Sequence, residues 1–400
     1  MDERMDMDRI EAEFSLTTPM FLGEANQACA QQIRPPAIKG ALRFWWRALN
    51  WARLRQQAPS DQVALQQLHH EESALFGQAT RDESRGPSGQ AGFLLRVSQQ
   101  HVHVSDQDFA NTPELQYLLG QGLYSKGLKR SYLQSGGHFT LQLALKRGLT
   151  DGQKQQLIEA LLCFGLLGNL GSRARKGFGS ITINRLEVSG QPQPLPTNQT
   201  EYKHAIAELL GPTAKADEPP FSAFSRLSQL QVGASGNDAI ALLRQHGFEM
   251  GMYRGYGRNK LTFGREAEQK FKPDHDWAYE VSEGKRQGRL PSRAVFGLPH
   301  PYFLSSTGKN VSIDVDVDGV SGGRRASPLF AHLHRLPDGQ FLLIHLLLRS
   351  LFLPDSASVK VKGKGAAHFE LSGNHVNQQL DWQVLDTFLA RFNERDVIHV

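Results

Sequence analysis

The chain of 400 residues is poor in cysteine, with only Cys29 and Cys163, which lie far apart and outside any CxxC or other metal-ligand spacing. This scarcity argues against a disulfide framework and against a structural zinc site. The sequence also lacks any run of about 18 apolar residues, and its start, MDERMDMDRI, is charged where a signal peptide needs an apolar stretch. We therefore expect a cytoplasmic protein that makes no use of a membrane.

Neither positive nor negative charge is in large excess, because the formal net charge is only +5. Its distribution is uneven, however. Between positions 121 and 180, nine Lys or Arg residues stand against two acidic residues. A local cationic field of this kind suits a polyanionic partner such as a nucleic acid.

Hydrophobic periodicity in the first half predicts alternating strands and helices. Strands are expected at 8–17, 92–104, 137–147 and 180–188, and helices at 35–57, 61–75 and 151–170. The order is β-α-β-β-α-β with one additional helix, which is typical of a ferredoxin-like domain closing near residue 190. Polar insertions at 78–92 and 105–137 are expected to be docking sites for partner subunits or RNA.

Proline-rich polar stretches between 191 and 220 have the composition of a linker. Beyond them we expect strands at 224–234, 312–320, 327–336 and 339–349, with helices at 237–250 and 382–394. The prediction is therefore an α+β protein with an N-terminal domain at 1–190, a linker at 191–220 and a related C-terminal domain at 221–400.

A glycine-rich stretch, LGNLGSRARKGFGSITI at 167–183, follows the second helix of the β-α-β-β-α-β order. Its glycines permit positive φ and let backbone amides approach phosphates, while its cations supply charge. It does not match the GxxxxGK[ST] loop, because Lys176 precedes Gly177. It also departs from the RNA-recognition signature, because Ser180 and Ile183 stand where aromatic residues belong. The alternative is a structural turn with solvated charges.

The first helix carries a basic stripe opposite its apolar face. Its members are Lys39, Arg43, Arg47 and Asn50, at spacings of four, four and three. Trp46 lies beside the stripe, where its indole is expected to stack on a base or sugar. The alternative is a solvated helix face with Trp46 packed at the rim of the core.

Histidine pairs are weaker signals. His101 with His103, and His332 with His334, lie two apart on predicted strands without a third ligand nearby, so no metal site is predicted. His138, after two glycines, is a candidate general base for a metal-independent nuclease, but the sequence supplies no partner acid.

Several motifs occur in a fixed order: TPMFLGEANQ, IRPPAIKGALRFWWRAL, ESALFG and LGNLGSRARKGFGS, then RAVFGLPHPYF, RRASPLFAHLHRLPDGQ and FLP. With them the sequence resembles the first-subunit family of the RAMP module in type III-B CRISPR (Cmr) effector complexes, which are Cas7-like members of the RAMP superfamily. The resemblance covers nearly the whole chain. It implies two tandem ferredoxin-like (RRM-like) RAMP domains, with the glycine-rich loop after the second helix of the first.

The resemblance implies a non-catalytic RNA-binding subunit without cofactor or metal. It would lie near the 3′ part of the CRISPR guide RNA, help to capture the complementary target RNA, and contact other RAMP subunits of the Cmr complex. One rival is a stand-alone, metal-independent RAMP endoribonuclease that processes guide precursors and uses His138. Another is a structural end cap that contacts protein alone.

Carried over motif by motif, the RNA-facing residues are expected to come from the first helix and the glycine-rich loop, which should converge in one positively charged trough. They are Arg34, Ile38, Lys39, Gly40, Arg43, Trp46 and Arg47, with Gly171, Ser172, Arg173, Arg175, Lys176, Gly177 and Phe178. Arg324 and Arg325, which precede a strand of the second domain, are weaker candidates for the same trough.

Overall fold

The computed structural model of the chain describes residues 8–24, 30–78, 89–257, 259–305, 307–363, 367–392 and 396–399. Cys29, the charged first seven residues and most of the insertion at 78–92 lie outside these ranges, so the predictions made for them are not addressed. Within the ranges, no helix is long and apolar enough to cross a membrane.

The first module has the predicted β-α-β-β-α-β order. Its elements are β1 (Arg9–Leu16), α1 (Pro35–Gln57), α2 (Asp61–Phe76), β2 (Phe93–His101), β3 (Val104–Ser105), α3 (Pro113–Leu119), β4 (Tyr132–Leu133), β5 (His138–Leu145), α4 (Asp151–Leu167), β6 (Ile181–Val188) and β7 (Gln191–Pro192). Its main sheet runs β2-β5-β1-β6-β7 with antiparallel pairs. This order confirms the ferredoxin-like prediction, and β3, α3 and β4 form the insertion between β2 and β5.

Local sequence explains where these elements begin. Prolines occupy the first positions of α1, where a missing backbone N–H costs nothing. The side chain of Thr150 accepts from Gln153 N, and the Gln153 side chain accepts from Thr150 N, so a capping box starts α4. Alternate residues of β1 are buried, as its period of two predicts.

The segment predicted as a linker is more ordered than its composition indicates. It contains α5 (Gln199–Leu210) and the short η2 (Gly211–Lys215). Tyr202 is fully buried, and its hydroxyl donates to Leu166 O at 2.7 Å, which fixes α5 against α4. Flanking prolines conceal this helix from composition alone, so the expectation of an unpacked linker is wrong for 199–215.

The second module repeats the ferredoxin-like order. Its elements are β8 (Gln229–Gly236), α6 (Ala239–Arg254), β14 (Leu329–Arg335), β15 (Phe341–Leu347), α9 (Gln383–Leu389) and β18 (Asp396–His399). Its sheet runs β14-β15-β8-β18, which corresponds strand for strand to β2-β5-β1-β6 of the first module. The prediction of two tandem ferredoxin-like domains is therefore confirmed, although β18 was not anticipated.

A third sheet is inserted into the second module in two pieces, one between α6 and β14 and one between β15 and α9. The inserted pieces contain β9 (Leu261–Thr262), β10 (Arg265–Glu266), α7 (Lys272–Ser282), η3 (Ser292–Phe296), β11 (His300–Leu304), β12 (Lys309–Val317), β13 (Val320–Gly323), β16 (Ala357–Gly363), β17 (Phe369–Ser372) and α8 (Gly373–Gln379). β9 and β10 form a separate two-stranded sheet. The sheet order is β11-β12-β16-β17, and β13 also pairs with β12. One face packs on α7 and α8 around its own apolar core.

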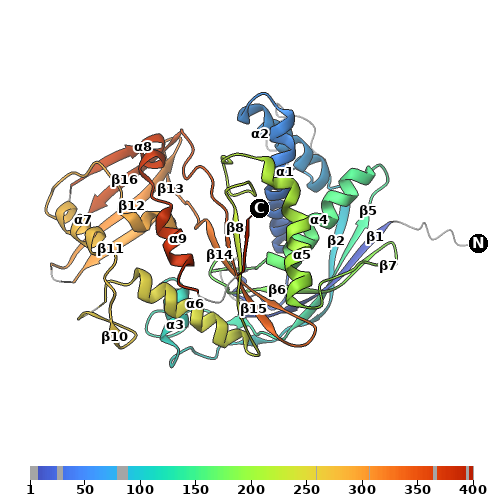
Figure 1. The fold of residues 1–400 in the computed structure, drawn as a ribbon, viewed down its shortest axis with the longest axis horizontal. Helices are drawn as coiled ribbons and strands as arrows, with labels where there is room; N and C mark the ends of the chain where they lie inside the picture. Colours follow the sequence, from blue (N-terminus) through green and yellow to red (C-terminus); the bar gives the residue numbers. More distant parts are fainter. Residues whose placement is uncertain are drawn as a thin grey trace, which may run out of the picture.

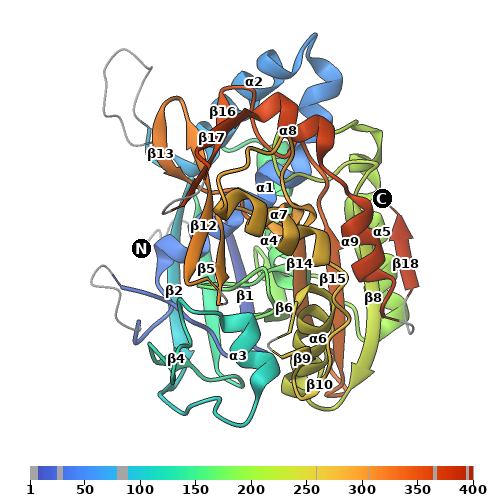
Figure 2. The ribbon, with the colours of Figure 1, turned by 90° about the vertical axis from the view of Figure 1, so that its left-hand side faces the viewer.

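The two ferredoxin-like modules stack in layers (Figure 1). One apolar core joins β1, α1 and α4 to β8 and β15, so the helices of the first module lie between the two sheets. The opposite face of the second sheet packs on α6 and α9. Figure 2 shows α3 beside α6 at the end of the molecule away from α2. The opposite face of the first sheet carries polar side chains.

Candidate nucleic-acid interface

The glycine-rich loop, residues 168–180, joins α4 to β6 and lies against the second module. Ala331 N donates to Arg175 O at 3.1 Å, and Asn169 Nδ2 donates to Ala331 O at 2.8 Å. These bonds attach the loop to β14, the edge strand of the second sheet. The loop therefore satisfies backbone groups that an edge strand would otherwise expose.

The loop glycines serve contacts within the protein. Gly171, Gly177 and Gly179 have φ values of +87°, +86° and +68°. A Cβ on Gly179 would lie 2.0 Å from Leu170 O, and one on Gly177 would lie 2.7 Å from Leu243 Cδ1. Protein atoms thus occupy the space where the sequence predicted a close approach to phosphate.

Two cations of the loop cap a helix of the same module. Arg173 Nε donates to Leu119 O at 2.5 Å, and Lys176 Nζ donates to Leu118 O at 3.0 Å. Both carbonyls belong to the last turn of α3, where positive charge interacts favourably with the helix dipole. Arg173 and Lys176 therefore lie side by side at the C-terminal end of α3.

Arg175 points away from Arg173 and Lys176. Its guanidinium donates to Ser327 O and lies 4.4 Å from the ring centroid of Phe330 and 5.7 Å from that of Phe44. Burial lowers the pKa of Arg175 to about 10. The cause of the divergence is the backbone, because Arg173 has a φ of +63° and turns the chain.

Arg324 and Arg325 lie near this region and come from the second module. Arg324 contributes to lowering the pKa of Arg173, after the larger effect of burial, and Arg325 contributes in the same way at Arg175. Arg325 is itself internal, since its Nη2 donates to Ser350 Oγ at 2.7 Å. Arg324 is exposed.

Ser172 and Phe178 have internal partners in this structure. Ser172 Oγ accepts from Arg130 Nη2 at 2.8 Å. Phe178 is fully buried and meets the ring of Phe21 edge-on, with centroids 5.6 Å apart. These positions anchor the loop, and the expectation of an RNA-facing Phe178 ring is wrong.

Most of the predicted basic stripe on α1 faces α2. Arg47 Nη1 donates to Glu72 Oε1 at 2.8 Å, and Arg43 Nε lies 3.5 Å from the same oxygen. Arg43 also donates to Gly77 O. Asn50 is buried. Helix α2 covers the stripe beyond the first turns of α1. The stripe is therefore neither a solvated helix face nor a continuous phosphate-binding surface.

Trp46 and Ile38 belong to the apolar core, and both are fully buried. Trp46 Nε1 donates to Gln156 Oε1 at 3.2 Å, and its ring meets Phe76 edge-on at 6.2 Å between centroids. The prediction that the Trp46 indole is available for base stacking is therefore wrong. A second helix, α2, closes over the side on which Trp46 lies.

An open groove with a volume of about 760 Å³ remains at the N-terminal end of α1. Its lining includes Pro35, Lys39, Gly40, Arg43, Phe93, Leu94 and Lys146. Lys39 Nζ lies 5.9 Å from the ring centroid of Phe93, and Leu94 is 58% exposed. We call this feature the α1 groove. It combines cations with the buried rings of Phe76 and Phe93 beneath them.

The α1 groove is strongly positive. Partial burial lowers the pKa of Lys39, and the neighbouring Arg43 and Lys146 lower it further. The first turn of α1 contains no acidic residue, and its N-cap, Arg34, donates to Gly23 O at 2.8 Å. The positive end of the helix dipole thus adds to the cations, an arrangement that favours phosphate.

Lys146 is a functional candidate that the sequence motifs missed. It follows β5, and the register pairs Phe93 with Leu145, which brings Lys146 to the groove. Lys146 is one of the nine cations between positions 121 and 180, but it comes close to Lys39 only because β2 pairs with β5. The local charge excess was therefore the one sequence signal for it.

The α1 groove and the loop cations do not form the single trough that the sequence predicted. Phe93 lies at the end of the first sheet where Arg9 pairs with Ala144. The loop lies at the other end, where Leu16 pairs with Ile181. The eight residues of β1 separate these ends by about 25 Å. The structure instead contains two basic regions.

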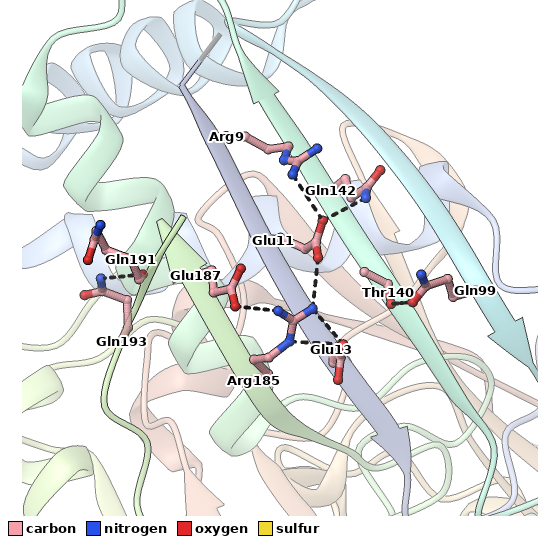
Figure 3. Close-up of polar contacts among 10 residues, drawn as sticks. All are labelled: Arg9, Glu11, Glu13, Gln99, Thr140, Gln142, Arg185, Glu187, Gln191 and Gln193. Carbon is pink, nitrogen blue, oxygen red and sulfur yellow. Dashed lines mark hydrogen bonds and ion pairs between the residues drawn. The ribbon is translucent and has the colours of Figure 1, made fainter. Parts of the chain in front are cut away.

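The uncovered face of the first sheet carries a network of ion pairs (Figure 3). Arg185 donates to Glu11 at 2.9 Å, to Glu13 at 2.7 Å and to Glu187. Ile183, at a position where the RNA-recognition signature has an aromatic residue, is 4% exposed. With three carboxylates around Arg185, this face does not resemble a base-stacking platform.

His138, the candidate general base of the rival nuclease, lies at the start of β5 beside a second histidine. His138 stacks on His101, with ring centroids 4.4 Å apart and planes 20° apart. Within the described ranges, no carboxylate forms an ion pair with His138. The His332 Nδ1 atom, in turn, lies 2.8 Å from Asn169 Oδ1, so this histidine is part of the contact between modules.

Comparison with known proteins agrees with this architecture. Residues 13–182 match the family model of the RAMP superfamily, which confirms the predicted resemblance for the first module. A comparison with curated protein sequences finds no match.

Two solved structures resemble the whole chain. One is the crystal structure of Cmr1 from Pyrococcus furiosus in its apo form, with 18% identity and a TM-score of 0.56 over 98% of each chain. The other, solved by cryo-EM, is the type III-B Cmr-beta bound to cognate target RNA, with 11% identity, a TM-score of 0.49, and 96% of this chain and 99% of that chain covered. Residues 13–182 are thus similar to the RAMP superfamily, and the chain shares the fold of Cmr1 along its length.

Proposed function

We propose that the protein is a non-catalytic, RNA-binding subunit of a cytoplasmic type III-B CRISPR effector complex. The α1 groove is the observation that carries this proposal. Lys39, Arg43 and Lys146 gather there around an apolar floor at an acid-free helix N-terminus. The RAMP family match and the Cmr1-like fold support the same class of protein.

The groove suits a nucleic-acid strand without base-specific readout. Its cations neutralise phosphates, and the exposed Leu94, on the adjoining face of the sheet, offers apolar contact to a sugar or base. Gly40 is exposed and has open space beside its Cα, so the backbone of α1 is approachable. In this proposal sequence specificity comes from pairing between guide and target RNA.

We further propose that the subunit lies near the 3′ part of the guide RNA, aids capture of the target RNA, and contacts other RAMP subunits. Co-purification of the tagged protein from its host, with identification of the attached proteins and small RNAs, tests this assignment. Recovery of the chain without RNA and without RAMP subunits contradicts it, and recovery with protein alone favours the end-cap alternative.

Binding of single-stranded RNA tests the groove itself. Log affinity should fall by about 0.7 per log unit of salt for each phosphate neutralised, so Lys39→Ala and Lys146→Ala should each weaken binding and reduce that slope. Lys285→Ala removes an exposed lysine just after α7 and is the matched control. Equal affinities and slopes in all four proteins would exclude the groove.

Catalysis is tested separately with a labelled repeat RNA in EDTA. Intact RNA after incubation is the expected result. A discrete cut that disappears in His138→Ala would establish the rival endoribonuclease.

A further inference from the structure

A buried carboxylate lies directly beside the α1 groove. Glu72 belongs to α2, one turn before the end of that helix, and is 8% exposed. Its Oε1 accepts from Arg47 Nη1 at 2.8 Å and lies 3.5 Å from Arg43 Nε. Burial of a carboxylate is costly, and a negative charge beside a phosphate site lowers its affinity for phosphate. The charge of the groove alone would therefore favour a neutral residue at this position.

Contacts from α2 and its C-terminal cap hold the guanidinium of Arg43. Nε faces Glu72, Nη2 donates to Gly77 O, and the group lies 5.8 Å from the ring centroid of Phe76. Nη1 has no hydrogen-bond partner among the described residues, and Arg43 lines the α1 groove with a third of its side chain exposed. The guanidinium is thus fixed through two of its nitrogens, and the donors of the third remain free.

The carbonyl of Gly77 is itself held in place. Gly77 N donates to Ser73 O at 2.9 Å, and Gly77 has a φ of +77°. A Cβ at this position would lie 2.7 Å from Ala91 N, so glycine is needed both for the backbone conformation and for the close approach. The end of α2 is therefore a second rigid partner for Arg43, beside Glu72.

The two lysines of the groove are held differently. Lys146 Nζ donates to Gln90 Oε1 at 2.9 Å, and Lys39 Nζ lies 5.9 Å from the ring centroid of Phe93. Neither lysine pairs with a carboxylate in the described part of the chain, whereas Arg43 does. Arg43 is thus the one groove cation there whose orientation is set by an acidic residue.

We propose that Glu72 is a positioning residue of the α1 groove, which fixes the guanidinium of Arg43 so that its free donors meet a phosphate of the bound RNA. The inference rests on the proposed RNA-binding function. A fork that is already held in its binding orientation loses less side-chain entropy when the phosphate binds. Arg47 supplies the charge that neutralises Glu72, so one positive charge of the three groups remains available to RNA.

Glu72→Gln distinguishes positioning from simple electrostatics, because the two predict opposite signs. Removal of a negative charge alone would strengthen the binding of RNA. If Glu72 positions Arg43, the variant should instead bind a labelled oligouridine of about ten nucleotides about tenfold more weakly at low salt, as expected for the loss of one charge-assisted contact. The slope of log affinity against log salt should fall by about 0.7. Fluorescence anisotropy measures both quantities.

A double-mutant cycle supplies a readout that a merely structural role would not give. Arg43→Ala and Glu72→Gln/Arg43→Ala should bind RNA equally, because Glu72 has nothing to position once Arg43 is absent. A general loosening of the fold would make the two losses add. Glu71→Gln is the matched control, since it removes the neighbouring carboxylate of α2, which pairs with Arg53 at 2.5 Å. It should bind RNA like the wild type.

Arg43→Lys tests the same idea without a change at the buried position. It keeps the charge, but one ammonium group cannot contact Glu72, Gly77 O and a phosphate together, so binding should be weaker than wild type. Equal or tighter binding by folded Glu72→Gln, additive losses in the cycle, or wild-type affinity in Arg43→Lys each overturn the positioning role. If Lys39→Ala still weakens binding in the same assay, the proposed function stands. Wild-type binding in Lys39→Ala, Lys146→Ala and Arg43→Ala alike would overturn the groove itself.

Discussion

The side-chain amide of Asn169 donates to the carbonyl of Ala331 at 2.8 Å and so joins the two ferredoxin-like modules. Its Oδ1 also lies 2.8 Å from His332 Nδ1. Asn169→Ala should lower the free energy of unfolding by about 1–3 kcal/mol, because it leaves buried polar groups without partners. Urea denaturation measures this, with Asn310→Ala, on an exposed strand position, as control. Equal losses in both variants would contradict the role of Asn169.

Alanine substitutions at Gly179 and Gly190 distinguish the cost of backbone strain from the cost of a steric clash. Their φ values are similar, +68° and +77°, but a Cβ on Gly179 would lie 2.0 Å from Leu170 O, whereas nothing lies within 4 Å at Gly190. Gly190→Ala should cost about 1 kcal/mol and Gly179→Ala clearly more. Thermal unfolding of both variants checks the order, and similar melting temperatures would refute the close approach.

Lys176 predicts a particular pH dependence of stability. Its pKa is lowered to about 7 in the folded protein, so the unfolded chain holds more protons between about pH 7 and about pH 10. The free energy of unfolding should therefore rise with pH in this window, relative to a Lys176→Met variant. Lys129→Met, at an exposed position, should remain parallel to wild type. Parallel curves for Lys176→Met as well would show that Lys176 is not desolvated.

Substitutions of Trp46 should change the stability of the fold and leave the affinity for RNA unchanged. Because it is fully buried, Trp46→Ala should cost about 3–5 kcal/mol. Trp46→Phe, which keeps most of the packing and loses the bond to Gln156, should bind single-stranded RNA with unchanged affinity. A large loss of RNA affinity in a folded Trp46→Phe protein would restore the stacking hypothesis.

Arg185 holds three carboxylates together on the uncovered sheet face (Figure 3). Hydrogen bonds to Glu13 and Glu187 raise the pKa of Arg185 above its ordinary value. Arg185→Met should lower the melting temperature at neutral pH, because the carboxylates then repel one another. The deficit should shrink as the pH falls and they become protonated. Arg226→Met, which breaks one exposed ion pair, should show a smaller deficit. A deficit independent of pH would contradict this explanation.

Element type and order could be predicted from sequence because they depend on local periodicity. The alternation of β1 and the capping box of α4 act within a few residues, and both modules followed from such signals. Helix α5 was missed because its burial depends on Tyr202 contacting α4, a tertiary interaction. The inserted sheet was missed because it pairs β12 with β16, two strands that are separated in the sequence by β14 and β15 of another sheet.

The basic residues illustrate the same limit. Spacing placed Arg43 and Arg47 on one helix face, but it could not show that Glu72 of α2 faces them. Conversely, Lys146 joins Lys39 only through the pairing of β2 with β5. Charge excess therefore located the basic regions approximately, whereas long-range packing determined which cations remain available.

The split of the inserted sheet has a consequence for synthesis on the ribosome. β12 must wait for β16, and β8, a central strand, receives its last neighbour only when β18 has emerged at the C-terminus. The inserted sheet is therefore complete only after β17, and the β14-β15-β8-β18 sheet only after β18. The nascent chain therefore exposes an unpaired edge of β8 until β18 has been synthesised, and such unpaired edges are prone to aggregation.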